Sequence, residues 1–242
     1  MQETNRKRYN ICYLCGKLIA DEEKTKDQVP PKQIFPSHIR KTSKLNLTTL
    51  FTHRVCNEAY KEDEDYFRLS LGAVDDGNPI LQEIWHDLEK SAKYPETRGL
   101  RNAVYREFIP EVRTKSGLIL PNVVIKTSDY ERISRVIWKI TRGLFFFEFK
   151  RFLPEKTIHA VIYIHGRNSN QDPEEVREIL EIVLAQPERG NHPKIFAYKY
   201  AVNPQEKNCA AWALLFWDRH LFLCAHHGPD CDCERCIQNN KI

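Results

Sequence analysis

The sequence predicts an α+β protein in which a small N-terminal unit precedes a larger C-terminal part with antiparallel strands. Three observations favour this fold class. Two cysteine- or histidine-containing pairs enclose short strand-like segments between residues 12 and 56. Apolar residues between Ile133 and Leu144 recur at the three- and four-residue spacing of a buried helix. The region 157–225 combines strand-like runs with one helical segment.

Length and composition set the broad class of the protein. The chain has 242 residues, of which 29% are charged and 41% hydrophobic, and its formal net charge is +4. These values are ordinary for a globular protein of one or two domains. The first residues contain no apolar leader, and no apolar run reaches the length of a membrane span. We therefore expect a cytoplasmic protein.

The first cysteine pair stands in the segment Cys12-Tyr-Leu-Cys15-Gly16, and a second pair, His53 and Cys56, follows about forty residues later. A CxxC pair followed by glycine is typical of a zinc knuckle, because the turn lets two thiolates face one ion. The second pair would complete a tetrahedral site with three cysteines and one histidine. Four protein ligands leave no place for water, so we expect a structural zinc.

The elements of this unit follow from the residues between the ligand pairs. The segment 27–35 reads as a strand that ends at two prolines, and 45–51 as a second strand. Residues 56–71 carry charges at helical spacing with an apolar side, which predicts a helix. The turn-forming residues 75–79 then predict a boundary, giving an N-terminal unit of residues 8–74 and a C-terminal domain of residues 75–242.

Taken in order, these motifs resemble the HNH endonuclease family. The resemblance rests on the CxxCG pair, on the segment Asp27-Gln-Val-Pro-Pro-Lys32, and on a late ligand pair followed directly by Asn57. A helix rich in Lys, Asp and Glu and ending in Tyr66-Phe67 completes it. The nearest pattern is that of a bacterial subgroup whose first motif reads Asp/Glu-His-Val-Pro-Pro-Lys. The resemblance covers residues 12–67, about a quarter of the chain.

The resemblance implies a zinc-stabilised ββα-metal unit that hydrolyses DNA phosphodiester bonds with a divalent ion, Mg²⁺ or Mn²⁺. By the same match, Asp27 and Asn57 would hold that ion, and Asn46 would be the middle asparagine that braces the loop. The match also assigns the structural zinc to its four ligands, Cys12, Cys15, His53 and Cys56. A role in phage defence follows by analogy only.

Gln28 departs from the family pattern, because it stands where the family has the histidine that takes a proton from the attacking water. An amide has no usable basicity near pH 7, and loss of a general base costs about 10²–10⁴-fold in rate. Four interpretations stay open: a weakened nuclease, a nuclease with a displaced base such as His38, a silent nuclease fold, or a deliberately inactivated variant. The alternative function is a non-catalytic zinc protein that binds nucleic acid or a protein partner.

Charge is distributed unevenly around these motifs. Between Gln28 and Asn57 the chain has no acidic residue and carries five basic ones: Lys32, Arg40, Lys41, Lys44 and Arg54. They form either a solvated loop or a strip that contacts DNA phosphates. The acidic run 62–65 is read as a solvated helix face. The alternative is that this run supplies an extra metal ligand, with Asp63 as the favoured member.

The C-terminal domain is expected to be α+β with a core of its own. Residues 80–93 predict a helix and 112–125 a hairpin. Ser128, with Glu131 three residues on, predicts a capping box that opens the longest helix. Its apolar end, 144–149, indicates a buried segment or a partner interface. Strand 157–165, helix 172–185, strand 194–201 and a hairpin over 210–225 follow, and the role of this domain stays open, with a partner protein or homo-oligomer among the options.

The tail carries the last candidate site. Cysteines and histidines crowd into the final residues, and we predict a second zinc held by Cys231, Cys233, Cys236 and His226. The alternatives are free thiols in a frayed terminus and a redox role. Eight cysteines without a leader sequence favour metal binding in a reducing compartment over a disulfide framework.

Overall fold

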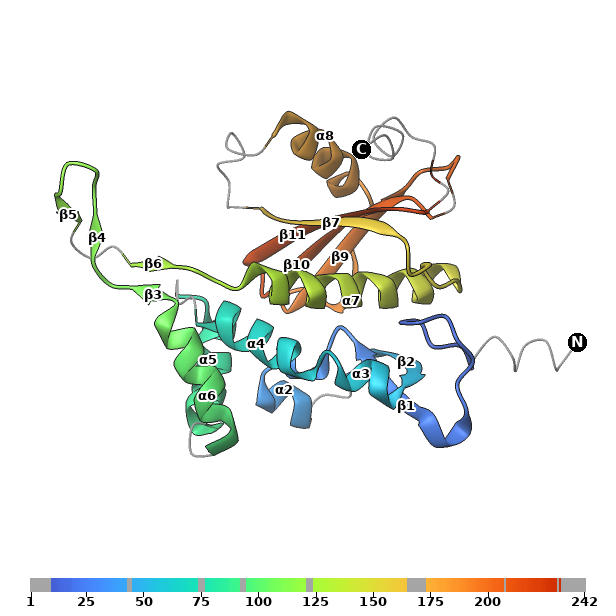
Figure 1. Ribbon diagram of the computed structural model, residues 1–242, viewed down its shortest axis with the longest axis horizontal. Helices are drawn as coiled ribbons and strands as arrows, with labels where there is room; N and C mark the ends of the chain where they lie inside the picture. The colour runs from blue at the N-terminus through green and yellow to red at the C-terminus, as the bar shows by residue number, and fades with distance from the viewer. Residues whose placement is uncertain are drawn as a thin grey trace, which may run out of the picture.

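The computed structural model describes residues 10–42, 45–73, 77–91, 95–120, 124–164, 173–206, 208–229 and 231. It confirms the α+β class: within these ranges, helices combine with strands that pair only in antiparallel fashion. The long helix α7 (Tyr130–Phe149) runs between the N-terminal unit on one side and a five-stranded sheet on the other (Figure 1). This helix is therefore the element that brings the two parts of the chain together.

The N-terminal unit is a two-stranded hairpin followed by helices. Strand β1 (Lys24–Val29) pairs with β2 (Thr48–His53), and Asp27 lies opposite Leu50. The single helix expected over 56–71 is instead two helices, α3 (Arg54–Glu58) and α4 (Lys61–Gly72). They separate at Tyr60, whose amide donates to the Asn57 carbonyl at 3.1 Å. This bond reaches back three residues, as in a 3₁₀-helix, and not the four of an α-helix.

Short helical segments complete this unit. The connection between β1 and β2 contains the turn η2 (Lys32–Ile34) and helix α2 (Ser37–Thr42), and the turn η1 (Asp21–Glu23) precedes β1. Helices α5 (Pro79–Ser91) and α6 (Pro95–Arg106) pack beside α4. The predicted helix over 80–93 is thus confirmed.

A narrow arm of strands extends from this region (Figure 1). Strand β3 (Phe108–Ile109) pairs with β6 (Ile125–Lys126), and β4 (Val112–Arg113) pairs with β5 (Ile119–Leu120). The turn between β4 and β5 needs Gly117, whose φ of +87° is rarely adopted by other residues. A hairpin is present where one was expected, but it spans 112–120 and not 112–125, because Ile125 lies in β6, which pairs with β3.

The N-terminal cap of helix α7 lies one residue later than predicted, at Asp129 and not at Ser128. The Arg132 amide donates to the Asp129 carboxylate at 3.3 Å, so Asp129 caps the helix and the predicted capping box of Ser128 with Glu131 is wrong. The Ser128 hydroxyl instead accepts a hydrogen bond from Lys126 Nζ at 2.7 Å. Ser128 therefore belongs to a polar network with Lys126 and Ser70 at the base of the arm and does not cap the helix.

The C-terminal sheet has the order β7-β11-β10-β9-β8. Its strands are β7 (Ile158–Ile164), β8 (Arg189–His192), β9 (Phe196–Val202), β10 (Ala210–Phe216) and β11 (His220–His227). The hairpin β10–β11 confirms the one predicted over 210–225. Helix α8 (Glu174–Leu184) covers one face of the sheet and α7 the other (Figure 1). Strand β8, Arg-Gly-Asn-His, has no apolar alternation, so its sequence did not predict it.

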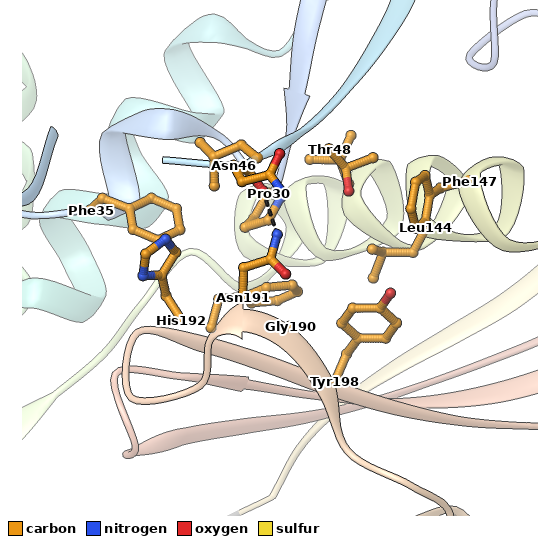
Figure 2. A pocket seen from close by; sticks show the side chains of 13 residues that line it. Pro30, Phe35, Asn46, Thr48, Leu144, Phe147, Gly190, Asn191, His192 and Tyr198 are labelled. Atoms are coloured by element: carbon orange, nitrogen blue, oxygen red, sulfur yellow. Dashed lines mark hydrogen bonds between the residues drawn. The ribbon is translucent and has the colours of Figure 1, made fainter. Parts of the chain in front are cut away.

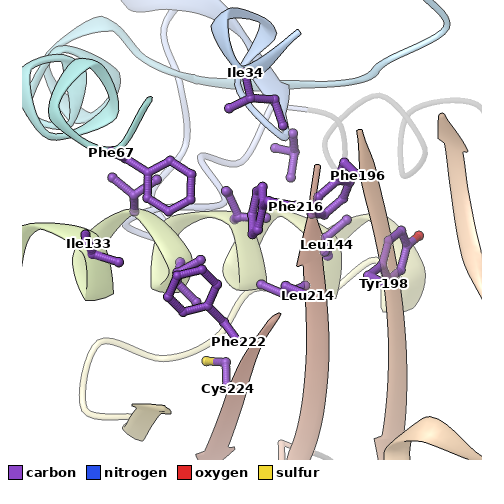
Figure 3. Close-up of a cluster of buried hydrophobic side chains, with 14 of the residues drawn as sticks. Ile34, Phe67, Ile133, Leu144, Phe196, Tyr198, Leu214, Phe216, Phe222 and Cys224 are labelled. Atoms are coloured by element: carbon purple, nitrogen blue, oxygen red, sulfur yellow. The ribbon is translucent and has the colours of Figure 1, made fainter. Parts of the chain in front are cut away.

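One apolar core joins both parts of the chain. Phe67 of α4, Ile133 and Leu144 of α7, and Phe216 and Phe222 of the sheet point into it (Figure 3). A smaller cluster lies under α8. The C-terminal part thus has a small cluster of its own under α8, but it shares the main core with the N-terminal unit across residue 74.

Close packing of α7 on β1 depends on a glycine. A Cβ atom at Gly143 would lie 2.6 Å from Cγ2 of Val29, closer than real carbon contacts allow. The helix thus lies directly on the hairpin strand that carries Asp27. Among the described residues, no helix combines the length and apolar character that crossing a membrane requires.

Candidate metal centre and nucleic-acid interface

The first predicted ligand set comes together in the structure. The ligand atoms of Cys12, Cys15, His53 and Cys56 all lie within 4.8 Å of one another. The Gly16 amide donates to the Cys12 carbonyl at 2.8 Å, and Gly16 has φ +73°, so the CxxCG segment forms the tight turn that the sequence predicts. Strand β2 and the start of α3 supply the other pair.

The orientation of His53 suits a metal ligand. Its Nε2 donates to the Leu18 carbonyl at 3.1 Å, and its Nδ1 faces the thiols, 3.3 Å from Cys15 Sγ and 3.8 Å from Cys56 Sγ. A hydrogen bond on one ring nitrogen leaves the other as a metal ligand, the usual arrangement around metal-bound histidine. The cluster is thus a candidate metal site whose donor set is compatible with structural zinc.

The thiols of this cluster differ in acidity. Burial acts to raise the pKa of Cys12, but hydrogen bonds from the Thr52 hydroxyl and from backbone amides outweigh it and lower the pKa to about 7. The pKa of Cys56 is raised to about 12, mainly by burial and then by the charges of Cys12 and Cys15. Crowded thiolates repel one another, and a bound dication would reverse that repulsion.

The two residues matched to a catalytic ion also lie together, and a lysine joins them. Lys139 Nζ of α7 lies 2.9 Å from Asp27 Oδ2 and donates to Asn57 Oδ1 at 2.9 Å. It also lies 2.5 Å from Glu64 Oε1. Lys139 is 1% exposed and Asp27 6% exposed, so three oxygens converge on one buried ammonium group.

Lys139 was not predicted as a site residue, and Glu64 was considered only as a member of the acidic run. Burial raises the pKa of Glu64, and the neighbouring Lys139 acts in the opposite direction. A sequence signal for Lys139 existed, since it stands three residues after Val136 and four before Gly143, on the buried face of α7. A charge on an apolar helix face needs buried partners.

Asp63 does not face this cluster. Its carboxylate lies 2.7 Å from Arg132 Nε and 2.7 Å from Arg135 Nη1. The acidic run is therefore not a solvated face: Asp63 fixes α4 to α7, and Glu64 is its member at the candidate site.

A pocket opens over these residues. It encloses about 240 Å³. Gln28 lies in its lining, half-buried, and three exposed lysines, Lys26, Lys32 and Lys61, come from β1, η2 and α4. The other lining residues include Asp27, Asn57 and Glu64. Basic side chains beside a polar pocket suit an anionic ligand such as a phosphate group.

The predicted basic strip is divided among several environments. Lys32 lines the pocket, and Lys41 and Arg54 are exposed. Arg40 lies 3.8 Å from Asp87 of α5, so an acidic partner offsets its positive charge at this surface. Lys44 lies outside the described residues. His38, the alternative base, contacts Glu83 of α5 and does not line the pocket.

Asn46 lies on another surface. It is exposed, and its carbonyl accepts a hydrogen bond from the Asn191 side chain of β8 (Figure 2). Together with Phe35, His192 and Tyr198 it lines a separate small cavity where the hairpin meets the sheet. Asn46 therefore joins the N-terminal unit to β8, a role that only the tertiary contact reveals.

The predicted tail site needs a correction. His226 is buried; its Nε2 accepts from Trp212 Nε1 at 3.1 Å and its Nδ1 donates to the Asn208 carbonyl at 2.8 Å. Both nitrogens are thus occupied, so His226 is not a ligand. His227 lies beside Cys231 instead, with Cys209 as a third member. Cys233 and Cys236 lie outside the described residues.

Comparison with known proteins adds no further assignment. No protein-family model matches the chain, and neither a curated protein nor a solved structure matches it.

Proposed function

We propose that this chain binds DNA through an HNH-like unit and hydrolyses phosphodiester bonds weakly with a divalent ion. The observation that supports the proposal is the convergence of the Asp27 and Asn57 oxygens on one point, in the lining of a pocket bordered by three lysines. Carboxylate and amide oxygens suit Mg²⁺ and Mn²⁺. The neighbouring Cys₃His cluster would hold the hairpin and the following helix together.

Each group in the pocket has a distinct task under this proposal. Lys26, Lys32 and Lys61 bind phosphate oxygens of the backbone. Gln28 orients a water by hydrogen bonding but takes no proton from it. An ion held by Asp27 and Asn57 would stabilise charge that develops on the phosphate and on the leaving oxygen.

The position of Lys139 favours a second candidate function, a non-catalytic nucleic-acid-binding module. Its ammonium group lies within hydrogen-bond distance of both proposed ion ligands. An ion bound there would repel it strongly, because two cations a few ångströms apart in a buried site are poorly screened. A divalent ion must therefore displace Lys139, and if it does not, the site binds DNA without cutting it.

Cleavage assays separate the two candidates. The unmodified chain should nick plasmid DNA slowly in Mn²⁺, and Asp27→Ala should abolish the nicking. Gln28→His should raise the rate by about 10²–10⁴-fold, because histidine supplies a base near neutral pH. Lys139→Met, which keeps an unbranched side chain of similar length without its charge, should raise the affinity for Mn²⁺ in the Gln28→His background.

The binding module predicts a different set of results. Neither the unmodified chain nor Gln28→His would then cut, whereas both would bind duplex DNA. Replacing Lys26, Lys32 and Lys61 by glutamine, one at a time, should make the negative slope of log affinity against log salt shallower by about 0.9 for each residue. Lys115 is the matched control, because it is an exposed lysine in the turn between β4 and β5 and does not line the pocket. If none of the three variants changes the salt slope, the pocket does not bind nucleic acid.

A further inference from the structure

A second group of soft ligands lies at the opposite end of the chain from the first. The ligand atoms of Cys209, His227 and Cys231 all lie within 4.8 Å of one another. His227 Nδ1 lies 3.5 Å from Cys231 Sγ. The two cysteines are 4% and 7% exposed, and His227 is half-buried. Two thiols and an imidazole in contact are the donor types of a zinc site.

The backbone around this group is built by short loops. The Asn203 amide donates to the Cys209 carbonyl at 3.0 Å, and the Cys209 amide donates to the Glu206 carbonyl at 3.1 Å. The Cys231 amide donates to the Gly228 carbonyl at 3.1 Å. These bonds fix one cysteine just before β10 and the other just after β11.

A glycine lets the two loops approach. A Cβ atom at Gly228 would lie 2.9 Å from the Cβ of Asn208, so a larger residue there would separate the loops. The close approach places Cys231 against Cys209 from chain segments that are adjacent in the sheet but distant in sequence. Geometry of this kind suits one ion that closes the open end of the β10–β11 hairpin.

We propose that Cys209, His227 and Cys231 bind a zinc ion that fastens the C-terminal segment to the sheet. His226, its neighbour in sequence, is excluded by its bonds to Trp212 and Asn208. Three protein ligands leave a fourth position on a tetrahedral ion. The sequence offers further thiols two and five residues after Cys231, at Cys233 and Cys236. The site is separate from the proposed nuclease pocket and does not depend on it.

A disulfide between Cys209 and Cys231 is the competing chemistry. The two cysteines also pack together as an apolar pair. The nearby imidazole of His227 distinguishes the two possibilities, because a zinc ion is coordinated by a third donor whereas a disulfide involves only the two sulfur atoms. Loss of His227 should therefore matter only if a metal is bound.

Zinc content of the full-length protein tests the proposal. The chain, purified under reducing conditions without chelator, should contain two zinc ions, one for each cluster. Cys209→Ala and Cys231→Ala should each reduce this to one, and so should His227→Ala. Cys224→Ala is the matched control, since Cys224 is a buried free cysteine of β11 outside both clusters; it should keep both ions.

Three further measurements distinguish loss of a ligand from misfolding. His227→Cys replaces one good ligand with another and should retain both zinc ions. With cobalt in place of zinc, it should strengthen the thiolate charge-transfer absorption. Circular dichroism should show an unchanged sheet in every variant that is counted.

The proposal is overturned if the unmodified chain holds one zinc that Cys231→Ala leaves in place. It is equally overturned if the protein purified under those same reducing conditions still lacks two thiols and Cys209→Ala restores one of them, which would identify a disulfide. Zinc loss on Cys15→Ala with one ion retained supports it, since the second site is then independent of the first.

Discussion

At the scale of the residue, one ammonium group is the shared ion-pair partner of two buried carboxyl groups. Asp27 and Glu64 are 6% and 8% exposed, and Lys139 lies within 3 Å of both. Tyr13 adds a hydrogen bond to Asp27 at 2.6 Å. Removing one member of such a group is costly, because the remaining charges stay buried without their counter-ion.

Lys139→Met should therefore lower the free energy of unfolding by about 3–5 kcal/mol. Adding Glu64→Gln to that variant should recover part of the loss, because one unpaired carboxylate is then removed. Urea denaturation with an unchanged m-value measures both effects. A loss below about 1 kcal/mol would show that water enters the cluster and screens it.

At the scale of the element, the contact between α7 and β1 is set by Gly143. Gly143→Ala should destabilise the protein by about 1–3 kcal/mol, because the new methyl group meets Val29. Val29→Ala in the same chain should relieve the clash. Gly99→Ala in α6 is the matched control: nothing lies within 4 Å of its Cβ position, so it should stabilise by about 0.5–1 kcal/mol. Thermal unfolding of the four proteins compares them.

A carboxylate links helix α2 to α5. Asp87 accepts hydrogen bonds from the Ser37 amide at 2.8 Å and from the Ser37 hydroxyl at 2.7 Å. Burial acts to raise its pKa, but these bonds and the charges of Arg68 and Arg40 lower it below the ordinary 3.8. A lowered carboxyl pKa contributes stability that is present above the unfolded-state pKa and is lost as the pH falls through the folded-state value.

Asp87→Asn should accordingly cost about 1.5 kcal/mol at pH 7, the size of a hydrogen bond to a charged group. The difference between the two proteins should shrink as the pH falls below 3.8 and the carboxylate takes up a proton. Chemical denaturation at pH 7 and at pH 3 checks the sign. An equal difference at both values would mean that the charge contributes nothing.

At the scale of the whole molecule, local patterns and long-range contacts were predictable to different degrees. The CxxCG turn, the hairpins and the long helix follow from spacing and turn residues, and the structure contains them. The convergence of Lys139 on Asp27 could not be predicted, because helical periodicity gives the face of a helix but not its partner. Cys209 was missed for the same reason: it stands far from the tail cysteines in sequence and meets Cys231 only through strand pairing.

The shared core predicts that the N-terminal unit does not fold alone. A fragment of residues 8–74 keeps the Cys₃His cluster but loses the sheet, whose aromatic rings contact Phe67, and α7, which supplies the counter-ion of Asp27. With zinc added, the fragment should bind the ion yet show little protection of β1 amides from hydrogen exchange. A fragment extended to residue 152 should regain part of that protection. A fully protected fragment 8–74 would contradict the single core.

Helix α7 is synthesised well after the residues that it contacts in the N-terminal unit, and this affects folding during translation. Lys139 follows its partners Glu64 and Asn57 by 75 and 82 residues. At about 5–20 residues per second, a ribosome adds that length in roughly 4–16 s. During this interval the emerging hairpin exposes the carboxylates and the apolar surface that α7 later covers. The N-terminal unit therefore acquires its final cover only after α7, which ends at Phe149, has been synthesised.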